Sequence, residues 1–461
     1  MLTYNLTEGG GSLYEKLYHA IREDILHGRL RAGEKLPSKR ALADHLKISK
    51  VTVETAYAQL CAEGYLHSRE KVGYFVESVS EAPPRPTWEN TSQKEQAELP
   101  GFEADLTSNR LMAEAFPFSV WAKISRQVIL DHGAELLAPM PNTGALTLRQ
   151  AIADHLYGFR SMKVSPDQIL VGAGTDFLYN VLIQLLGRDK CYAVEDPGYH
   201  KIWKVYEAAG VPCKAVPLDE EGVCPDALGN ADVLHISPSH HFPTGVVTPI
   251  GRRQALLAWA EQQEGRYLIE DDYDSEFRLS GRPIPTLQSF DRSGKVIYMN
   301  SFTKSLAPSI RISFLVLPVE LMERFREKLG FYACTVPSFE QYTLAEFLCS
   351  GHFEKHLNRM KKYYRGQRDL LLEALRDSAF GEILEISNQD AGLHFLLKVK
   401  TSRTDRELKE LCADSGIKVQ CLSDFYMNGN HADTHTIVAN YSGFDCTKAK
   451  DLLKRMEVNR T

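Results

Sequence analysis

Apolar positions in the first 77 residues have helical spacing and then change to the spacing of short strands. In the first stretch an apolar residue recurs every four positions, which predicts one buried helix face formed by Leu13, Leu17, Ile21 and Ile25. Ser38 stands where a second helix would be capped, and a third helix carries apolar residues over 53–60. Residues 65–66 and 74–76 then predict a hairpin around 71–73. We therefore expect residues 1–77 to form a small helical unit that ends in a two-stranded wing.

Residues 78–104 break this pattern. Pro83, Pro84, Pro86 and Pro100 stand among Glu, Ser, Gln and Lys, with few large apolar residues. Such a composition cannot bury enough apolar surface to form a core and is typical of an extended linker. The segments on either side of it are expected to be separate domains.

From about residue 105 onward, short continuous apolar runs alternate with amphipathic stretches. The runs are Gln168–Gly172, Cys191–Glu195, Val233–Ile236, Tyr267–Glu270 and Val296–Met299. Continuous rather than alternating apolarity indicates strands covered on both faces, which predicts an α/β domain with a mainly parallel sheet over 105–336. Long amphipathic helices and the strand-like run Leu393–Leu397 predict a smaller C-terminal α+β subdomain over 337–461.

Composition refines this picture only in part. A chain of 461 residues exceeds one ordinary core, and its net charge of −6 excludes a wholly basic nucleic-acid protein. The chain begins without a cationic stretch ahead of an apolar one, and its apolar runs stay well short of the roughly 18 residues that span a bilayer. Nine cysteines without a C-x-x-C pair argue against a disulfide framework. We expect a cytoplasmic protein with reduced thiols and no membrane partner.

The predicted third helix has the residue types that a helix entering the DNA major groove needs at its start. Lys50, Thr52 and Thr55 lie in its first turns, where polar or cationic side chains meet bases and phosphates. From Lys35 to Lys50 there are five cations and one acid, Asp44, although the whole chain is negative. This local excess suits phosphate contact. The alternative is a small helical cap whose cations are only solvated.

Over these first 77 residues the chain resembles the GntR family of winged-helix regulators. The matching runs are Leu30-x-x-Gly33-x-x-Leu36-Pro37-Ser38-x-Arg40-x-Leu42-Ala43 and Ser49-Lys50-x-Thr52-Val53-x-x-Ala56-Tyr57-x-x-Leu60-x-x-Glu63-Gly64. The resemblance implies that Arg40, Lys50 and Thr52 contact double-stranded DNA, with Ser38 near the backbone and Gly73 at the tip of the wing. Many relatives have Arg where this chain has Lys50, so a phosphate contact is expected there rather than a bidentate base contact.

A lysine in a Ser/Thr-rich segment follows the last of the apolar runs in the large domain. Hydroxyls precede Lys304 by three and by one residue, at Ser301 and Thr303, and the guanidinium of Arg311 follows seven residues later. Pyridoxal phosphate needs a lysine for an imine, an anion against its pyridine nitrogen, phosphate donors and an aromatic over its ring. Ser301 and Arg311 can bind phosphate oxygens. Taken alone, such a lysine is usually only a surface lysine.

Two further segments supply candidate partners for this cofactor. The run 270–273, Glu-Asp-Asp-Tyr, ends a predicted strand, and a carboxylate there faces the crevice where α/β sheets bind ligands. Such an acidic cluster can instead hold Mg²⁺, but no phosphate-binding P-loop accompanies it. The run 171–176, Val-Gly-Ala-Gly-Thr-Asp, leads into a helix that begins near Phe177, whose amides can bind a phosphate.

Residues 105–450 resemble the type I aminotransferase fold, with these segments in the same order. The resemblance implies Lys304 as the Schiff-base lysine, Asp271 against the pyridine nitrogen and Tyr273 toward the ring hydroxyl. The further residues that it brings to the cofactor are Gly174, Thr175, Ser301, Thr303 and Arg311 around the phosphate and Tyr199 over the ring. The run 237–245, Ser-Pro-Ser-His-His-Phe-Pro-Thr-Gly, and the fused winged helix narrow the resemblance to the MocR/GabR-like regulators.

Two positions depart from a working aminotransferase. Phe242 stands where those enzymes commonly have an Asn before Pro-Thr-Gly, although the regulators often have an aromatic there. The C-terminal strand, Val438 to Phe444, has no Arg where aminotransferases usually bind the substrate carboxylate, and such a clamp supplies much of the positioning in transamination. Lys201 is a weaker candidate for an anionic contact, although a lysine in an amphipathic helix is more often solvated.

The sequence therefore supports three hypotheses. The first is a regulator that binds a DNA operator as a head-to-tail homodimer and senses pyridoxal phosphate or an amino compound through the cofactor at Lys304. The second is an active class I/II aminotransferase with an appended DNA-binding domain. The third keeps the aminotransferase fold without a cofactor, as a dimerisation platform. None of them requires a metal ion.

Overall fold

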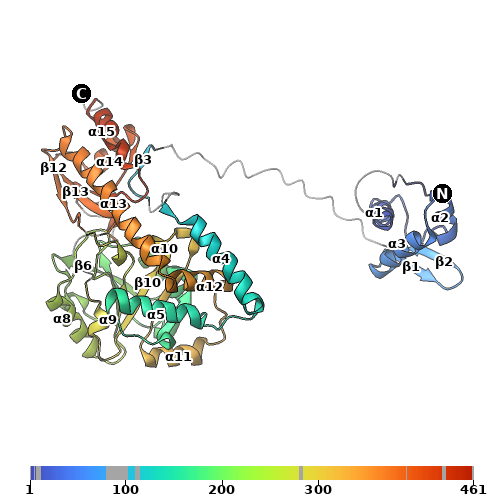
Figure 1. Cartoon of the computed structure of the whole chain (residues 1–461), viewed down its shortest axis with the longest axis horizontal. Coiled ribbons are helices and arrows are strands. Elements are labelled where there is room, and N and C mark those ends of the chain that lie inside the picture. The colour runs from blue at the N-terminus through green and yellow to red at the C-terminus, as the bar shows by residue number, and fades with distance from the viewer. Residues whose placement is uncertain are drawn as a thin grey trace. The chain divides into compact units, whose positions relative to one another are not determined.

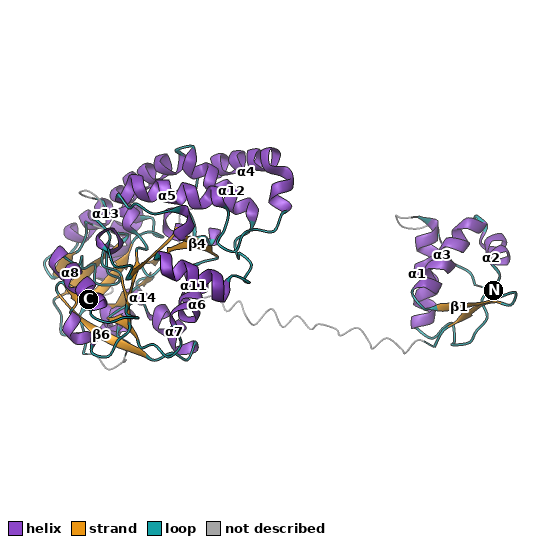
Figure 2. Cartoon of the chain, turned by 90° about the horizontal axis from the view of Figure 1, so that it is seen from below, coloured by secondary structure: helices purple, strands orange, loops and turns teal. Residues whose placement is uncertain are grey.

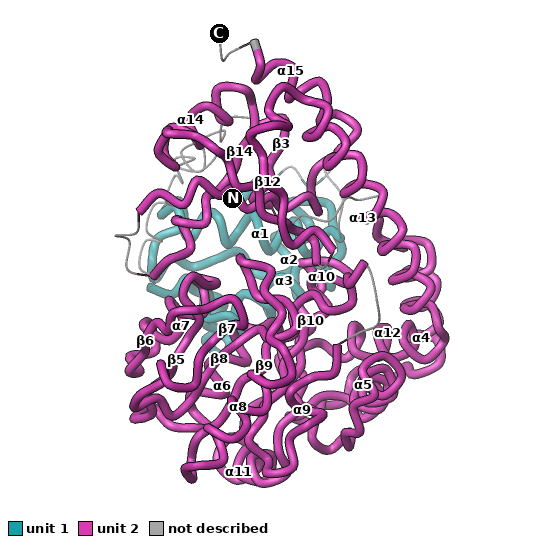
Figure 3. The backbone as a smooth tube through the Cα atoms, turned by 90° about the vertical axis from the view of Figure 1, so that its left-hand side faces the viewer, with its two compact units in different colours: residues 1–99 teal, residues 100–461 magenta. Residues whose placement is uncertain are grey.

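The computed structural model describes residues 2–4, 6, 12–78, 102–108, 115–279, 284–390, 392–427 and 432–458. The chain forms two compact units, Met1–Leu99 and Pro100–Thr461 (Figure 3). The predicted linker covers residues 78–104, and residues 79–101 of it lie outside the described residues. At its end the chain is already packed, since Ala104 is buried in a short strand. The predicted limit between residues 336 and 337 stays a prediction.

The first unit contains three helices and a hairpin, as the apolar spacing predicts (Figure 1). Its elements are α1 (Leu13–Leu26), α2 (Lys39–Leu46), α3 (Lys50–Ala62), β1 (Leu66–Arg69) and β2 (Gly73–Val76). Tyr57 is fully buried in the core, and its hydroxyl donates to the carbonyl of Pro37 at 3.0 Å. The prediction that Leu13 belongs to the buried helix face is wrong. It is 46% exposed because it is the first residue of α1, where no further turn covers it.

The second unit is built on an eight-stranded sheet in the order β4-β11-β10-β9-β8-β5-β6-β7. The strands are β4 (Ile169–Gly172), β5 (Tyr192–Asp196), β6 (Cys213–Asp219), β7 (Gly222–Val223), β8 (Val233–Ile236), β9 (Tyr267–Asp271), β10 (Val296–Ser301) and β11 (Ser313–Val316). From β10 to β6 every neighbouring pair is parallel, whereas β11 and β7 pair antiparallel with their neighbours. The prediction of a mainly parallel sheet is confirmed.

Helices cover both faces of this sheet (Figure 2). Along β11 the side chains alternate between two cores, with Phe314 and Val316 in one and Leu315 in the other. The helices are α4 (Phe118–His132), α5 (Leu146–Arg160), α6 (Thr175–Leu186), α7 (His200–Ala208), α8 (Ile250–Glu261), α9 (Leu287–Phe290), α10 (Phe302–Ser305), α11 (Val319–Leu329) and α12 (Ser338–Cys349). The predicted apolar runs, which form β4, β5, β8, β9 and β10, are therefore continuous because both sides of these strands are buried.

A smaller antiparallel sheet, in the order β12-β13-β16-β15, lies in the C-terminal part. The elements of this part are α13 (His352–Asp377), β12 (Leu384–Ser387), β13 (His394–Val399), α14 (Asp405–Asp414), β14 (Ile417–Lys418), β15 (Gln420–Cys421), β16 (Thr436–Asn440) and α15 (Ala449–Val458). Strand β3 (Ala104–Asp105) pairs with β14, so the start of the second unit joins its C-terminal part.

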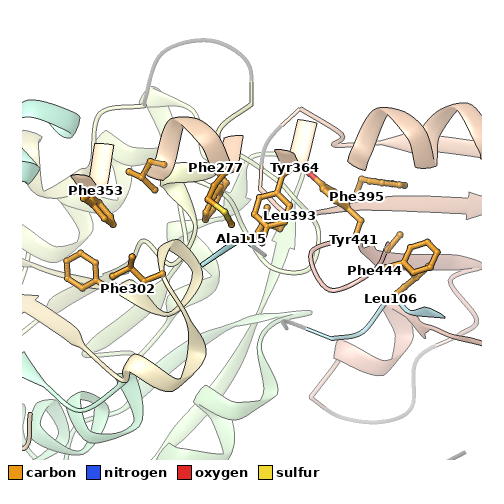
Figure 4. Close-up of a cluster of buried hydrophobic side chains, with 14 of the residues drawn as sticks. Leu106, Ala115, Phe277, Phe302, Phe353, Tyr364, Leu393, Phe395, Tyr441 and Phe444 are labelled. Carbon is orange, nitrogen blue, oxygen red and sulfur yellow. The ribbon is translucent and has the colours of Figure 1, made fainter. Parts of the chain in front are cut away.

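One apolar core runs through both parts of the second unit (Figure 4). Phe277 and Phe302 come from the segments that follow β9 and β10, and Tyr364 and Tyr441 come from the C-terminal part. The rings of Phe277 and Tyr364 meet edge to face at 5.4 Å. This shared core fixes the ends of β9 and β10 against the small sheet. Among the described residues, no helix is long and apolar enough to cross a membrane.

Candidate DNA-binding surface and cofactor site

The start of α3 presents the predicted DNA-contacting residues. Ser49 caps the helix, because its Oγ accepts from the amide of Thr52 at 3.1 Å and lies 2.8 Å from Thr52 Oγ1. Lys50 is the first helical residue and is exposed. Thr52 is only half-exposed, and its hydroxyl is already engaged with Ser49. Lys50 is thus the more accessible of the two predicted contacts.

Helix α2 positions the other predicted contacts. Ser38 caps it by accepting from the amide of Ala41 at 3.2 Å, as its sequence position predicts. Arg40 is exposed in its first turn. The neighbouring Lys39 instead pairs with Glu54 of α3 at 2.7 Å. Part of the positive excess is therefore neutralised within the unit, whereas Arg40 and Lys50, the two cations predicted to contact DNA, are both exposed.

The prediction that Gly73 forms the tip of the wing is wrong. Gly73 is the first residue of β2 and lies opposite Arg69, so the tip consists of residues 70–72. Gly73 has φ +133, and a Cβ atom there would lie 3.1 Å from Cε of Lys35. Glycine suits this position because its φ is positive and because the side chain of Lys35 packs where a Cβ atom would lie.

A cavity of about 210 Å³ brings together most of the residues predicted to bind the cofactor. Those that line it are Lys304, Asp271, Tyr273, Ser301, Thr303, Thr175, Tyr199 and Arg311. Asp271 and Ser301 are the last residues of β9 and β10, and Thr175 begins α6. The cavity therefore lies at the carboxyl ends of parallel strands, where α/β sheets bind ligands.

Lys304 lies on the short helix α10 and faces the cavity. Burial lowers the pKa of its amine to about 8, although the charge of Asp274 works in the opposite direction. An ordinary lysine is almost fully protonated near neutral pH, whereas this one has a substantial neutral fraction. The neutral amine is the nucleophile that attacks a carbonyl.

Asp271 is buried and held by neighbours behind the cavity. The hydroxyl of Tyr179 donates to its Oδ2 at 3.1 Å, and His235 Nε2 lies 3.6 Å from the same oxygen. The other ring nitrogen of His235 is 2.8 Å from the hydroxyl of Tyr206. These contacts orient the carboxylate toward the cavity. Tyr179, His235 and Tyr206 carried no recognisable signal in the sequence, because they belong to three separate apolar elements.

The part of the site predicted to bind the phosphate lies around Gly174. This residue has φ +89, and a Cβ atom there would collide with the guanidinium of Arg311. Asp176 pairs with Arg311 at 3.3 Å and with Lys201 at 2.7 Å. A cation, a glycine backbone and the N-terminus of α6 thus meet in one place, which suits an anionic group. The helix begins at Thr175, slightly before the predicted start near Phe177.

Tyr199 and Asn440 lie on other walls of the cavity. Tyr199 is 43% exposed, and its ring meets Phe242 edge to face at 6.0 Å. Asn440 is the last residue of β16, within the strand that lacks the expected Arg. Within the described residues, no arginine other than Arg311 lines the cavity.

Behind Tyr273 lies a group of three buried side chains that the sequence analysis did not identify: His240, Asp274 and His394. His240 Nδ1 is 2.9 Å from Asp274 and 3.1 Å from the hydroxyl of Tyr273. Asp274 directly follows Tyr273, and His240 belongs to the quoted run 237–245, so both were visible in the sequence. Their contact was not, because it joins segments that lie far apart along the chain.

These residues fit pyridoxal phosphate. A buried amine, an oriented carboxylate and a cationic corner that Arg311 forms next to Gly174 meet at one cavity, and these are the parts that the cofactor's aldehyde, ring nitrogen and phosphate require. The fit does not depend on a single residue, since the donors come from separate strand and helix ends.

Comparison with known protein families gives two matches. Residues 13–76 match the model described as "Bacterial regulatory proteins, gntR family", and residues 104–435 match "Aminotransferase class I and II". The second match identifies the larger part as a domain of the pyridoxal-phosphate-dependent aminotransferases. It covers most of the chain.

Full-length relatives share both parts. The chain is 36% identical to the uncharacterized HTH-type transcriptional regulator YdeL of Bacillus subtilis, over 96% of each chain. It is 30% identical to the probable rhizopine catabolism regulatory protein MocR of Rhizobium meliloti, over 94% of this chain and 90% of the relative. It is also 30% identical to the pyridoxine biosynthesis regulator PdxR of Corynebacterium glutamicum, over 94% and 93%.

Solved structures share the fold of the second unit. A Pyrococcus horikoshii kynurenine aminotransferase matches with a TM-score of 0.69 and 22% identity, over 80% of this chain and 94% of that one. An archaeal alanine:glyoxylate aminotransferase also has a TM-score of 0.69, with 23% identity, over 80% and 92%. The chain belongs to the MocR-like HTH-type transcriptional regulators, in which a GntR-type helix-turn-helix precedes a class I and II aminotransferase domain.

Proposed function

We propose that this protein binds an operator through the surface around Arg40 and Lys50 and holds pyridoxal phosphate at Lys304. Its affinity for DNA changes with cofactor occupancy, or when an amino compound reacts with the bound cofactor. The observation that carries the proposal is the cavity in which Lys304, Asp271 and Arg311 meet, within a chain that also has a helix-turn-helix.

The DNA contacts rest on the exposed start of α3 and on α2. Arg40 and Lys50 supply positive charge, Ser38 and Thr52 lie beside them, and Gly73 begins the second strand of the wing, next to its tip. Because Thr52 is half-buried and bonded to Ser49, its contribution is expected to be smaller than that of Lys50. A regulator of transcription acts on chromosomal DNA, so we place it in the cytoplasm.

Each residue of the cavity has a distinct role in this proposal. Pyridoxal phosphate supplies an aldehyde that reacts with amines and a ring that withdraws electrons. Lys304 would supply the amine, whose pKa burial lowers to about 8, and Asp271 would supply the anion for the ring nitrogen. Tyr273 would face the ring hydroxyl, and Tyr199 would cover the ring. The side that binds phosphate consists of Gly174, Thr175, Ser301, Thr303 and Arg311.

Sensing accounts for the cavity better than sustained transamination does. Asn440 ends β16, in the strand where an aminotransferase presents its carboxylate-binding Arg. Lys201, the other candidate, is paired with Asp176 at 2.7 Å. A substrate carboxylate would have to compete with Asp176 for this lysine, which weakens the positioning that transamination needs.

We further propose a head-to-tail homodimer. Large apolar side chains are exposed on α4, on the 3₁₀ segment Gly133–Leu137 that follows it, and on α12, which packs against both. They are Phe118 (64% exposed), Ile129 (50%), Leu130 (69%), Leu137 (79%) and Phe339 (40%). Apolar residues gathered on adjoining elements are typical of a protein interface. Two recognition helices would suit a repeated or palindromic operator.

The test is DNA binding by the full chain to the DNA upstream of its own gene, measured with and without pyridoxal phosphate and then with a panel of amines. The double variant Arg40→Ala/Lys50→Ala should lower the affinity for DNA. The slope of the logarithm of affinity against the logarithm of salt concentration should become smaller by about one for each phosphate contact that is lost. Arg29→Ala, an exposed cation paired with Asp24 in the same unit, is the control. Undiminished binding by the double variant would overturn the assigned surface.

The rival enzyme function has its own measurement. A working aminotransferase produces keto acid steadily from an amine donor, whereas the regulator should show an affinity change for DNA with little turnover. An affinity that neither the cofactor nor any amine changes would rule out ligand sensing.

A further inference from the structure

The three buried side chains behind Tyr273 form a network that faces the cofactor cavity. His240 and Asp274 are 4% and 3% exposed, and both oxygens of Asp274 lie within hydrogen-bond distance of His240 Nδ1, at 3.1 and 2.9 Å. A carboxylate only accepts, so Nδ1 carries the proton and donates to Asp274. The hydroxyl of Tyr273 lies 3.1 Å from the same nitrogen.

The backbone is shaped to permit this contact. Gly392 has φ +69, and a Cβ atom there would collide with the ring of His240 and lie 2.6 Å from Asp274 Oδ2. The next residue of the network, His394, bonds through Nε2 to the carbonyl of Pro243 at 3.1 Å, and its ring lies 4.8 Å from that of His240. The residues on both sides of the His240–Asp274 pair therefore hold it in one arrangement.

Two acceptors compete for the single proton of the Tyr273 hydroxyl. One is Asp274, since its two oxygens and the hydroxyl all lie within 3.1 Å of the same nitrogen, His240 Nδ1. The other is an acceptor within the cavity, which for pyridoxal phosphate is the ring oxygen. A carboxylate that already accepts from a ring N–H is a weaker competitor, because part of its negative charge is neutralised by that donor.

We propose that His240 is a positioning residue that occupies Asp274 and so directs the hydroxyl of Tyr273 toward the bound cofactor. This inference rests on the proposed function, because it requires pyridoxal phosphate at Lys304. It assigns a role to His240 and Asp274 beyond holding the fold. Phe242 stands where aminotransferases commonly have the Asn that contacts the ring hydroxyl, so that position supplies no hydrogen-bond donor here.

Several charged groups face this hydroxyl and enter any pH dependence. Burial raises the pKa of Tyr273 well above its ordinary value, and the charges of Asp274, Asp271 and Glu195 add to this effect. On the other side, burial and the neighbouring charge of His240 lower the pKa of His394 well below its ordinary value. The hydroxyl thus keeps its proton as a donor.

The experiment is a pH titration of the visible absorption of the full chain loaded with pyridoxal phosphate. A hydrogen bond donated to the ring oxygen stabilises the negative charge of that oxygen. Without this bond, the charge favours the protonated form of the nitrogen that joins the lysine to the cofactor. Loss of that bond should raise the titration midpoint by about one to two pH units. Tyr273→Phe should show this rise directly.

The informative variants are His240→Leu and His240→Asn, which have nearly the same size. Leu removes the donor and should raise the midpoint as Tyr273→Phe does, whereas Asn keeps an N–H near Nδ1 and should leave it close to that of the unmodified protein. In the Tyr273→Phe background, His240→Leu should add nothing. If His240→Leu does not fold, His240→Phe keeps a ring without a donor and takes its place.

The outcomes separate this inference from the proposed function. A protein that develops no visible absorption with pyridoxal phosphate would contradict the proposed function itself. The role of His240 would be overturned if His240→Leu left the midpoint of the loaded protein unchanged. It would also be overturned if the midpoint shifts of His240→Leu and Tyr273→Phe added up in the double variant. A midpoint that rises equally with Asn and with Leu would point to packing rather than to the donated hydrogen bond, and would also overturn it.

Discussion

At the scale of single residues, the second unit changes the chemistry of side chains by enclosing them. The amine of an ordinary lysine is protonated near neutral pH. Burial lowers the pKa of the Lys304 amine to about 8. Asp271 is fixed by Tyr179, and Gly174 leaves space for the guanidinium of Arg311. The residue types were evident in the sequence. Their properties follow from the surrounding atoms.

The first prediction concerns the pH dependence of cofactor attachment. Only the neutral amine of Lys304 reacts, so the rate with pyridoxal phosphate should rise about tenfold per pH unit below pH 8 and level off above it. Stopped-flow absorbance of the cofactor-free full chain measures this rate. A rise that continues to the pH at which ordinary lysines titrate would contradict the shifted pKa, and Lys304→Ala should show no attachment.

At the scale of elements, a buried ion pair joins α5 to the end of β9. Arg160 ends α5 and pairs with Asp272, which follows β9 directly, and both side chains are at most 2% exposed. Asp272 also accepts from the hydroxyls of Tyr298 at 2.7 Å and Ser275 at 2.8 Å. The carboxylate that follows Asp271 therefore belongs to the framework rather than to the cavity, and it holds the strand end that presents Asp271.

The second prediction is that Arg160→Met strongly destabilises the protein. Removal of the guanidinium leaves the charge of Asp272 buried, which should lower the free energy of unfolding by about 3–5 kcal/mol. Urea unfolding followed by circular dichroism measures the change. Arg406→Met is the matched control, because Arg406 is 85% exposed in its pair with Glu410, so its substitution should leave the free energy of unfolding nearly unchanged. Equal effects of the two variants would contradict the framework role.

At the scale of the whole molecule, the proposed regulation requires that the two units communicate. The first unit and the second unit are each compact, with their own cores. A ligand at Lys304 changes DNA affinity only if it binds two arrangements of the helix-turn-helix units with different affinity. The exposed apolar surface of α4, α12 and the segment between α4 and α5 is where we expect the partner subunit.

The third prediction tests this surface. Leu137 is 79% exposed, so Leu137→Asp should leave folding intact while it places a charge in the dimer interface and converts the dimer to monomers. Sedimentation velocity of the full chain measures the association state. Val319→Asp is the control, since Val319 is 60% exposed at the start of α11. A monomeric unmodified protein, or a variant that remains dimeric, would contradict the interface.

Local patterns predicted much of this protein. The helices and hairpin of the first unit and the strands of the large sheet were evident, because each depends on a short run of neighbours. The resemblance singled out Lys304, Asp271 and Tyr273, and the structure brings these three residues to one cavity. Two details were wrong for local reasons. Leu13 fits a helical spacing but begins its helix, and Gly73 lies beside a turn instead of within it.

The sequence by itself determined which segments become helices and strands, and it placed a cationic helix start and a lysine predicted to bind the cofactor in one chain. Only the tertiary structure decided which side chains meet. His240, Asp274 and Gly392 come together from three distant segments, and Asp272 turns away from Asp271 to pair with Arg160. Spacing along a chain fixes the face of an element on which a residue lies. Contacts between distant elements depend on how all the intervening residues pack.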